Sequence, residues 1–215
     1  MSKLINAGAA NTIDIRALNM KKNLNVYQVK ENLNLALNAC KGVGLRIPGI
    51  NPQAFIEKKP HLILAVLWQV IRLYLTQAID LKHCPEIMRL AEENEELTDL
   101  MKLTPETILI RWINFHLKKQ GVDKKITNLG GDLKDSTAIL YVLNRLDPKC
   151  TLEGLKEEDA LKRAEIMINN AESIGVPPLI RPSDVTQGNV KLNTVFVAEL
   201  FNTKHGLEEL NEEEI

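Results

Sequence analysis

The sequence predicts an all-α protein that contains two copies of a small helical domain. Apolar residues recur with helical periodicity along most of the 215 residues, and long runs of alternating β-branched and polar residues are missing. Two regions about 130 residues apart repeat the order of helix, glycine, proline-containing connection and apolar helix. This spacing is too long for a short-repeat solenoid and suits two domains, each a bundle of about four main helices.

The first copy is expected to occupy residues 1–79. One of its helices precedes Gly44, where apolar residues recur at helical spacing: Val29, Leu33, Leu37 and Cys40. A second, strongly apolar helix is expected over Leu62–Leu75. Residues 3–6 resemble residues 141–144 of the second copy, so the first copy starts in the middle of the repeated pattern. We therefore expect this domain to lack its N-terminal helices.

Residues 80–103 are polar and acidic, which predicts a linker between the two copies. Five apolar side chains within it favour a short helix that lies against a domain: Ile87, Leu90, Leu97, Leu100 and Met101. We expect a linker with structure of its own.

The second copy is expected to occupy residues 104–206, followed by an acidic tail at 207–215. Thr104-Pro105-Glu106 reads as a helix N-cap, a proline in the first turn and an acid near the positive helix end. The helix behind it is amphipathic, with Trp112 and His116 on its core face. Further helices are predicted by two sets of residues. One helix is expected to open at Asp132 and Asp135 and to turn four apolar residues inward: Ile139, Leu140, Leu143 and Leu146. Another is expected before Gly175, where apolar residues recur at helical spacing: Leu161, Ala164, Ile168 and Ala171.

The two copies align residue by residue. Gly44 matches Gly175, and Pro52 matches Pro182. Residues 62–67 align with residues 192–197, although Asn193 and Thr194 replace apolar residues of the first copy.

Charge and cysteine content narrow the classes of partner and compartment. The net charge is −1, yet residues 1–78 carry ten Lys or Arg against three acids, which favours an acidic partner that is not nucleic acid. Cys40, Cys84 and Cys150 form no CxxC pair, as is typical of a reducing compartment. The apolar run Leu62–Leu75 is too short to span a bilayer. We expect a cytoplasmic monomer that binds no membrane.

Enzyme signatures are missing, since the sequence contains no GxxxxGK[ST], GxGxxG, HExxH or GxSxG motif. The histidines are scattered, and His83 beside Cys84 is a poor metal pair because adjacent helical residues diverge. Gly130-Gly131-Asp132 fits either a capped loop or, less well, an anion site at a helix N-terminus. We therefore expect no catalysis, no cofactor, no metal and no small-molecule substrate.

Several longer motifs resemble the fimbrin/plastin family. In the first copy these are Asn11-Thr12-Ile13-Asp14, Arg16-Ala17-Leu18-Asn19, residues 31–38 and Lys59-Pro60-His61-Leu62; in the second they are residues 111–117, 132–136 and 192–198. The resemblance implies tandem calponin-homology domains, namely the first actin-binding pair of such a protein. It also implies that the chain binds the side of actin filaments as part of an actin-bundling protein associated with the cytoskeleton.

The resemblance and the basic charge together select candidate actin contacts. In the first copy these are Lys21, Lys22, Lys58, Lys59, His61, Leu64 and Arg72; in the second they are Thr104, Arg111, Lys118 and Lys119. Lysine pairs steer an acidic partner but are often only solvated surface, and lysines at a helix C-terminus also complement the helix dipole. The apolar helix 62–75 either packs within the protein or offers a second apolar face to a partner.

Two further functions stay open. The domains could serve as an interaction or regulatory module for a non-actin protein, for example microtubules or a signalling partner. An uncharted enzyme would require titratable groups clustered in a pocket, which the sequence does not offer.

Overall fold

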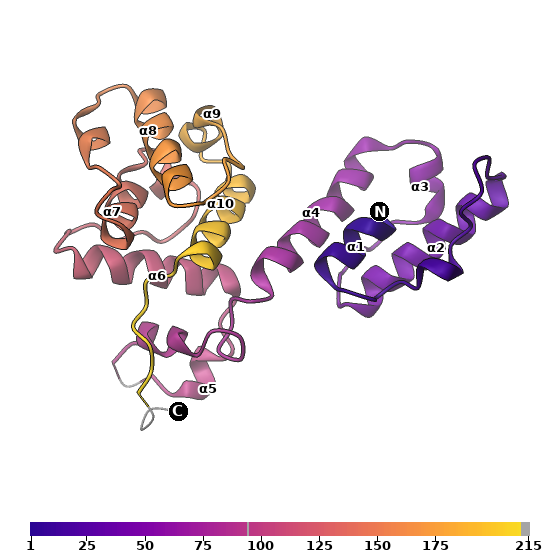
Figure 1. Cartoon of the computed structure of the whole chain (residues 1–215), viewed down its shortest axis with the longest axis horizontal. Coiled ribbons are helices and arrows are strands. Elements are labelled where there is room, and N and C mark those ends of the chain that lie inside the picture. Colours follow the sequence, from indigo (N-terminus) through magenta and orange to yellow (C-terminus); the bar gives the residue numbers. More distant parts are fainter. Residues whose placement is uncertain (94, 212–215) are drawn as a thin grey trace. The chain divides into compact units, whose positions relative to one another are not determined.

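The computed structural model describes residues 1–93 and 95–211, and every regular element in these ranges is helical, which confirms the all-α class. The chain divides into two compact units, Met1–Gln77 and Ala78–Ile215, each of which is described by itself (Figure 1). Within the described ranges, no helix has both the length and the apolar character needed to cross a membrane.

Unit 1 is a small bundle built on two long helices. Its elements are α1 (Ser2–Gly8), η1 (Ile15–Ala17), α2 (Val26–Gly42), α3 (Pro52–Ile56) and α4 (Pro60–Thr76). Asn25 caps α2 in a reciprocal capping box with Gln28, so the helix start is specified locally. Apolar side chains from α1, α2, α4 and two connecting segments form the core: Ile5, Ile13, Ala36, Leu37, Cys40, Ile47, Val66 and Val70.

Unit 2 holds the remaining elements. They are η2 (Pro85–Leu90), α5 (Leu97–Leu100), α6 (Pro105–Lys119), η3 (Gly131–Leu133), α7 (Thr137–Leu146), η4 (Glu153–Lys156), α8 (Ala160–Ser173), α9 (Pro182–Thr186) and α10 (Val190–Thr203). Helix α6 packs against α7, α10 and η2, while α8 packs against α7 and α9. Trp112 of α6 is fully buried and meets the ring of Phe201 edge-on at 5.5 Å, as expected for a core residue.

The structure confirms the internal repeat. Gly44 and Gly175 both adopt a left-handed backbone, with φ of 87° and 95°, at the ends of the corresponding helices α2 and α8. Proline opens both α3 and α9, as the alignment predicts. Val66 and Val70 of α4 are buried, and so are Phe196 and Leu200 at the matching positions of α10.

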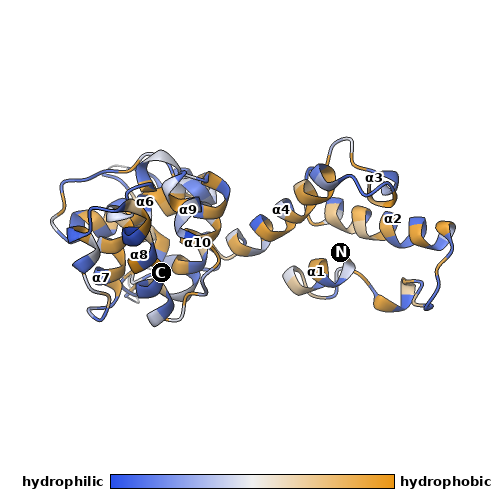
Figure 2. Ribbon diagram, turned by 90° about the horizontal axis from the view of Figure 1, so that it is seen from above, coloured by the Kyte–Doolittle hydropathy of each residue, from blue (hydrophilic) through white to orange (hydrophobic). Residues whose placement is uncertain are grey.

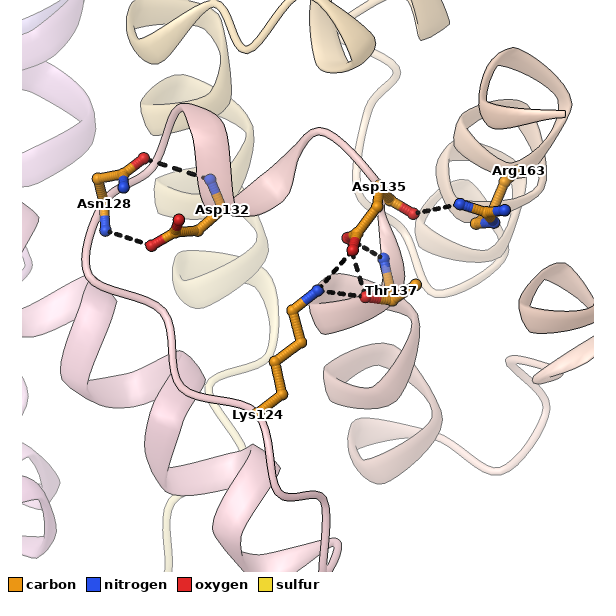
Figure 3. Close-up of polar contacts among 6 residues, drawn as sticks. All are labelled: Lys124, Asn128, Asp132, Asp135, Thr137 and Arg163. Carbon is orange, nitrogen blue, oxygen red and sulfur yellow. Dashed lines mark hydrogen bonds and ion pairs between the residues drawn. The ribbon is translucent and has the colours of Figure 1, made fainter. Parts of the chain in front are cut away.

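The predicted helix start at Asp132 and Asp135 is wrong in detail, as the polar contacts in Figure 3 explain. Asp132 Oδ2 accepts hydrogen bonds from the backbone N–H groups of Thr127 and Asn128, and this holds a loop around the short helix η3. Ser136 then adopts a left-handed φ of 59°, so α7 begins only at Thr137. Asn128 Oδ1 accepts from Gly130 N–H at 2.9 Å, which fits the capped-loop interpretation of this segment.

The region predicted as one short linker helix instead forms two, η2 and α5. Ile87, Leu90 and Leu100 are buried as expected, whereas Leu97 and Met101 are 49% and 68% exposed. Leu161, the first residue of the apolar spacing that predicts α8, is half exposed. Of the predicted acidic tail, residues 212–215 lie outside the described part of the chain.

Candidate functional site

The α4 surface of unit 1 consists of Lys58, Lys59, His61, Leu64, Ile71 and Arg72. Lys59 is the N-cap residue of α4, and Pro60 starts the helix because its fixed φ suits the first turn. Lys58 has a left-handed φ of 53° and ends the short helix α3, since its N–H donates to the Phe55 carbonyl. This turn presents both lysines to solvent next to the start of the helix.

Helix α4 is apolar along much of its length, as Figure 2 shows, but only one side of it is buried. Val66 and Val70 enter the core, while Leu64 is 62% exposed and Ile71 is 39% exposed. Leu64 and Ile71 are seven residues apart, so they share one face. In unit 2, Thr194 at the position matching Leu64 is only 5% exposed, because α10 packs against both α6 and α9. Helix α4 therefore has one side buried in the core of unit 1 and an apolar side exposed, and contact of that exposed side with a partner stays a prediction.

One charge of the α4 surface has a carboxylate partner close by in the chain. Lys59 Nζ lies 2.7 Å from Glu57 Oε2, and this contact lowers the pKa of the Glu57 carboxyl. Lys21 and Lys22 are exposed in the segment between η1 and α2, away from any regular element. Unit 1 therefore exposes basic side chains on two different segments.

Two of the predicted residues, Thr104 before α6 and Arg111 within it, serve the fold of unit 2. Thr104 is the N-cap, and its hydroxyl accepts a hydrogen bond from the Thr107 N–H. Arg111 Nη1 lies 2.5 Å from Glu95 Oε2 in an ion pair. The two side chains are 19% and 13% exposed, respectively. This hydrogen bond raises the pKa of Arg111 and lowers that of Glu95, so both stay charged. The structure thus gives Arg111 an internal partner that holds the segment before α5 against α6.

The C-terminal end of α6 carries the exposed lysines Lys118 and Lys119. Lys119 Nζ lies 5.5 Å from the centre of the Phe115 ring, in a cation–π arrangement, and 3.9 Å from Glu208 Oε1. The approach of Glu208 was not expected from the sequence. It follows from the path of the segment after α10, which runs back past α6 within unit 2 (Figure 1).

Next to this end of α6, unit 2 has an open groove of about 830 Å³. Basic and acidic side chains both line it, including Arg89, Lys118, Lys124 and Lys125 beside Glu92. The lysines are evident in the sequence but the groove is not, because its walls include residues 89–93 before α6 and residues 121–125 after it. The groove is therefore mixed in charge, and Lys118 is one of the side chains that line it.

Comparison with known proteins defines the class of protein. The family model described as calponin homology (CH) domain matches residues 1–76 and 103–206. The chain therefore belongs to the calponin homology domain family, in agreement with its all-α fold and its internal repeat.

Among its relatives are fimbrins and plastins, which confirms the resemblance. The chain is 42% identical over 218 residues to fimbrin of Saccharomyces cerevisiae, with 100% of this chain and 34% of that protein covered. It is 41% identical over 224 residues to Plastin-1 of Homo sapiens, with 100% and 35% covered. The chain thus spans about a third of these relatives' length.

A solved structure agrees with this assignment. The crystal structure of the actin-crosslinking core of Schizosaccharomyces pombe fimbrin matches with a TM-score of 0.83 and 36% sequence identity. The match covers 97% of this chain and 42% of that chain.

Proposed function

We propose that this chain binds the side of actin filaments and acts as part of an actin-bundling protein of the fimbrin type. The related crystal structure is that of an actin-crosslinking core, and the relatives include fimbrins and plastins. In this proposal the chain is a non-enzymatic binding module that works as a monomer without nucleic acid, membrane or small-molecule substrate.

The observation that carries the proposal is the exposed side of α4. An apolar stripe with Leu64 at 62% exposure lies beside exposed Lys58, Lys59 and His61. Actin filaments present an acidic surface, so the lysines steer the encounter and the apolar side chains supply contact area. The lysines at the end of α6 form a second basic contact in unit 2. Arg111 is not included among the proposed actin contacts because it forms an ion pair with Glu95.

We propose residues 1–79 and 104–206 as the two calponin homology domains, with 80–103 as the connecting segment and 207–215 as the tail. The two family matches support this division. We also propose a cytoplasmic, cytoskeleton-associated location. Cys40, Cys84 and Cys150 are buried and unpaired, as is typical of a reducing compartment.

High-speed cosedimentation with filamentous actin tests the proposal. We expect the chain to pellet with filaments in low salt and to be released as the salt concentration rises. The reason is that the screening length of charge interactions shortens from about 10 Å at 0.1 M to about 3 Å at 1 M. Failure to pellet at any salt concentration would reject the proposal. Salt-resistant binding to another protein, unaffected by changing Lys58 and Lys59, would instead support the non-actin interaction module.

A further inference from the structure

Three side chains that ligate metals meet in unit 2, outside the proposed actin contacts. Cys84 precedes η2, Glu86 lies in its first turn, and His205 follows α10. The thiol sulfur, a carboxylate oxygen and an imidazole nitrogen all lie within 4.8 Å of one another. The Cys84 thiol donates to Glu86 Oε2 at 3.3 Å. This group joins segments more than a hundred residues apart in the chain.

The position of His205 is set by the core of unit 2. Its backbone carbonyl accepts hydrogen bonds from Trp112 Nε1 at 2.7 Å and from His116 Nε2 at 2.9 Å. Its ring lies 5.6 Å from the ring of Phe201. The next residue, Gly206, has a left-handed φ of 61°, and a Cβ there would collide with a side chain of α7. The turn is therefore built for glycine, and it directs the imidazole toward η2.

The segment that carries Cys84 and Glu86 is held against the segment that follows His205. Arg89 of η2 donates to the Glu209 carbonyl at 3.0 Å and to the Glu208 carbonyl at 3.5 Å. Cys84 is buried, while Glu86 and His205 are partly exposed. The three ligand atoms thus lie at an accessible edge between two anchored segments.

The ligand set selects the chemistry. Thiolate, imidazole and carboxylate are the ligands of Zn²⁺, whereas Ca²⁺ and Mg²⁺ take oxygen ligands. Zinc–ligand distances of about 2.0–2.3 Å put tetrahedral ligands about 3.5 Å apart, so modest side-chain rotation completes the site. Three protein ligands leave the fourth position to water.

The same three residue types also occur in cysteine nucleophile sites, but the environment here opposes that role. Burial and the neighbouring Glu86 carboxylate raise the pKa of the Cys84 thiol to about 12. The thiol is therefore protonated at neutral pH and is a poor nucleophile. A bound cation would instead favour the thiolate form of Cys84, since coordination displaces the thiol proton to solvent.

We propose that Cys84, Glu86 and His205 form a Zn²⁺ site that clamps the segment after α10 onto η2. The Leu207 N–H donates to His205 Nδ1 at 3.2 Å, and coordination through either ring nitrogen displaces this bond. If the metal binds Nδ1 it takes the acceptor directly; if it binds Nε2, the proton moves to Nδ1. The Leu207 amide is therefore a reporter of occupancy.

The test is a titration of the purified chain with Co²⁺ and with Zn²⁺. We expect one ion per chain, a thiolate-to-Co²⁺ charge-transfer band that Zn²⁺ abolishes, and a shift of the Leu207 amide resonance. Cys84→Ser should remove the band, and His205→Gln should weaken binding more than about tenfold, since changing even a partner of a metal ligand costs about 10–100-fold in affinity. His83→Gln is the matched control, since His83 is the exposed neighbour of Cys84 and its ring pairs with Asp80 at 2.8 Å.

Far-ultraviolet circular dichroism establishes that each variant is folded, and His205→Gln decides the matter if Cys84→Ser does not fold. The proposal is overturned if the wild-type chain gives no charge-transfer band. It is also overturned if the band persists in Cys84→Ser, or if His83→Gln weakens binding as much as His205→Gln.

Discussion

Trp112 connects the sequence pattern of α6 to the stability of unit 2. Its side chain is fully buried, and its indole N–H donates to the His205 carbonyl. Trp112→Ala should lower the free energy of unfolding by about 3–5 kcal/mol, because the truncation leaves a large cavity and removes the indole hydrogen bond. Urea unfolding measures this loss. Leu161→Ala, at a position 50% exposed, should change stability by less than about 1 kcal/mol. A Trp112→Ala curve that overlays wild type would contradict the burial.

His116 should make the protein sensitive to acid. Burial lowers its pKa to about 4, despite the hydrogen bond to the His205 carbonyl. Its Nδ1 is buried without a partner, so protonation would place a charged N–H where no acceptor is available. The unfolded chain, with an ordinary histidine pKa near 6.5, binds the proton more readily. The contribution of His116 to the free energy of unfolding is therefore fully present above about pH 6.5, and it is lost as the pH falls toward 4.

We expect His116 to account for a loss of about 2–3 kcal/mol between pH 7 and pH 4.5. Urea unfolding at the two pH values measures it. His116→Gln should remove this part of the loss, whereas His61→Gln, at an exposed position of α4, should keep it. An equal loss in His116→Gln and wild type would assign the acid sensitivity to other groups.

At the scale of elements, α4 shows how one helix serves both the core and a surface. Lys58→Glu combined with Lys59→Glu should weaken filament binding about tenfold in low salt, since two attractive contacts become repulsive. Unfolding should change little because both side chains are exposed. Cosedimentation at several actin concentrations gives the affinity.

The matched control for this charge reversal is Lys156→Glu with Lys162→Glu, which changes the net charge equally on η4 and α8. Both of these lysines are exposed. If the control weakens binding as much as the α4 variant, the effect comes from overall charge, and the α4 surface is not the contact.

At the scale of the whole molecule, each unit carries proposed filament contacts, namely the α4 surface in unit 1 and the lysines at the end of α6 in unit 2. The chain spans about a third of fimbrin of Saccharomyces cerevisiae. Bundling requires two filament-binding modules in one particle, so we expect this chain to bind filaments without crosslinking them. High-speed pelleting with actin, combined with no increase of actin in low-speed pellets, is the expected result. Bundles in the low-speed pellet would mean that the chain self-associates or carries a second binding surface.

Much of the fold was predictable because its signals are local. The Asn25–Gln28 capping box, the prolines that open α3 and α9, and the apolar spacing in α2 and α8 specify helices from neighbouring residues. The loop after Asn128 was harder, because Asp132 bonds backward to the loop instead of opening a long helix.

The sequence by itself determined the helical class, the repeat and the basic character of the first copy, since periodicity and composition need no knowledge of contacts. Only the tertiary structure decided which side of α4 is exposed, that Arg111 is occupied by Glu95, and that His205 meets Cys84. Each of these depends on packing between segments far apart in the chain. Local patterns carry no record of that packing, so the sequence named residues of the α4 surface without showing which side is exposed, and the approach of Cys84, Glu86 and His205 is visible only in the fold.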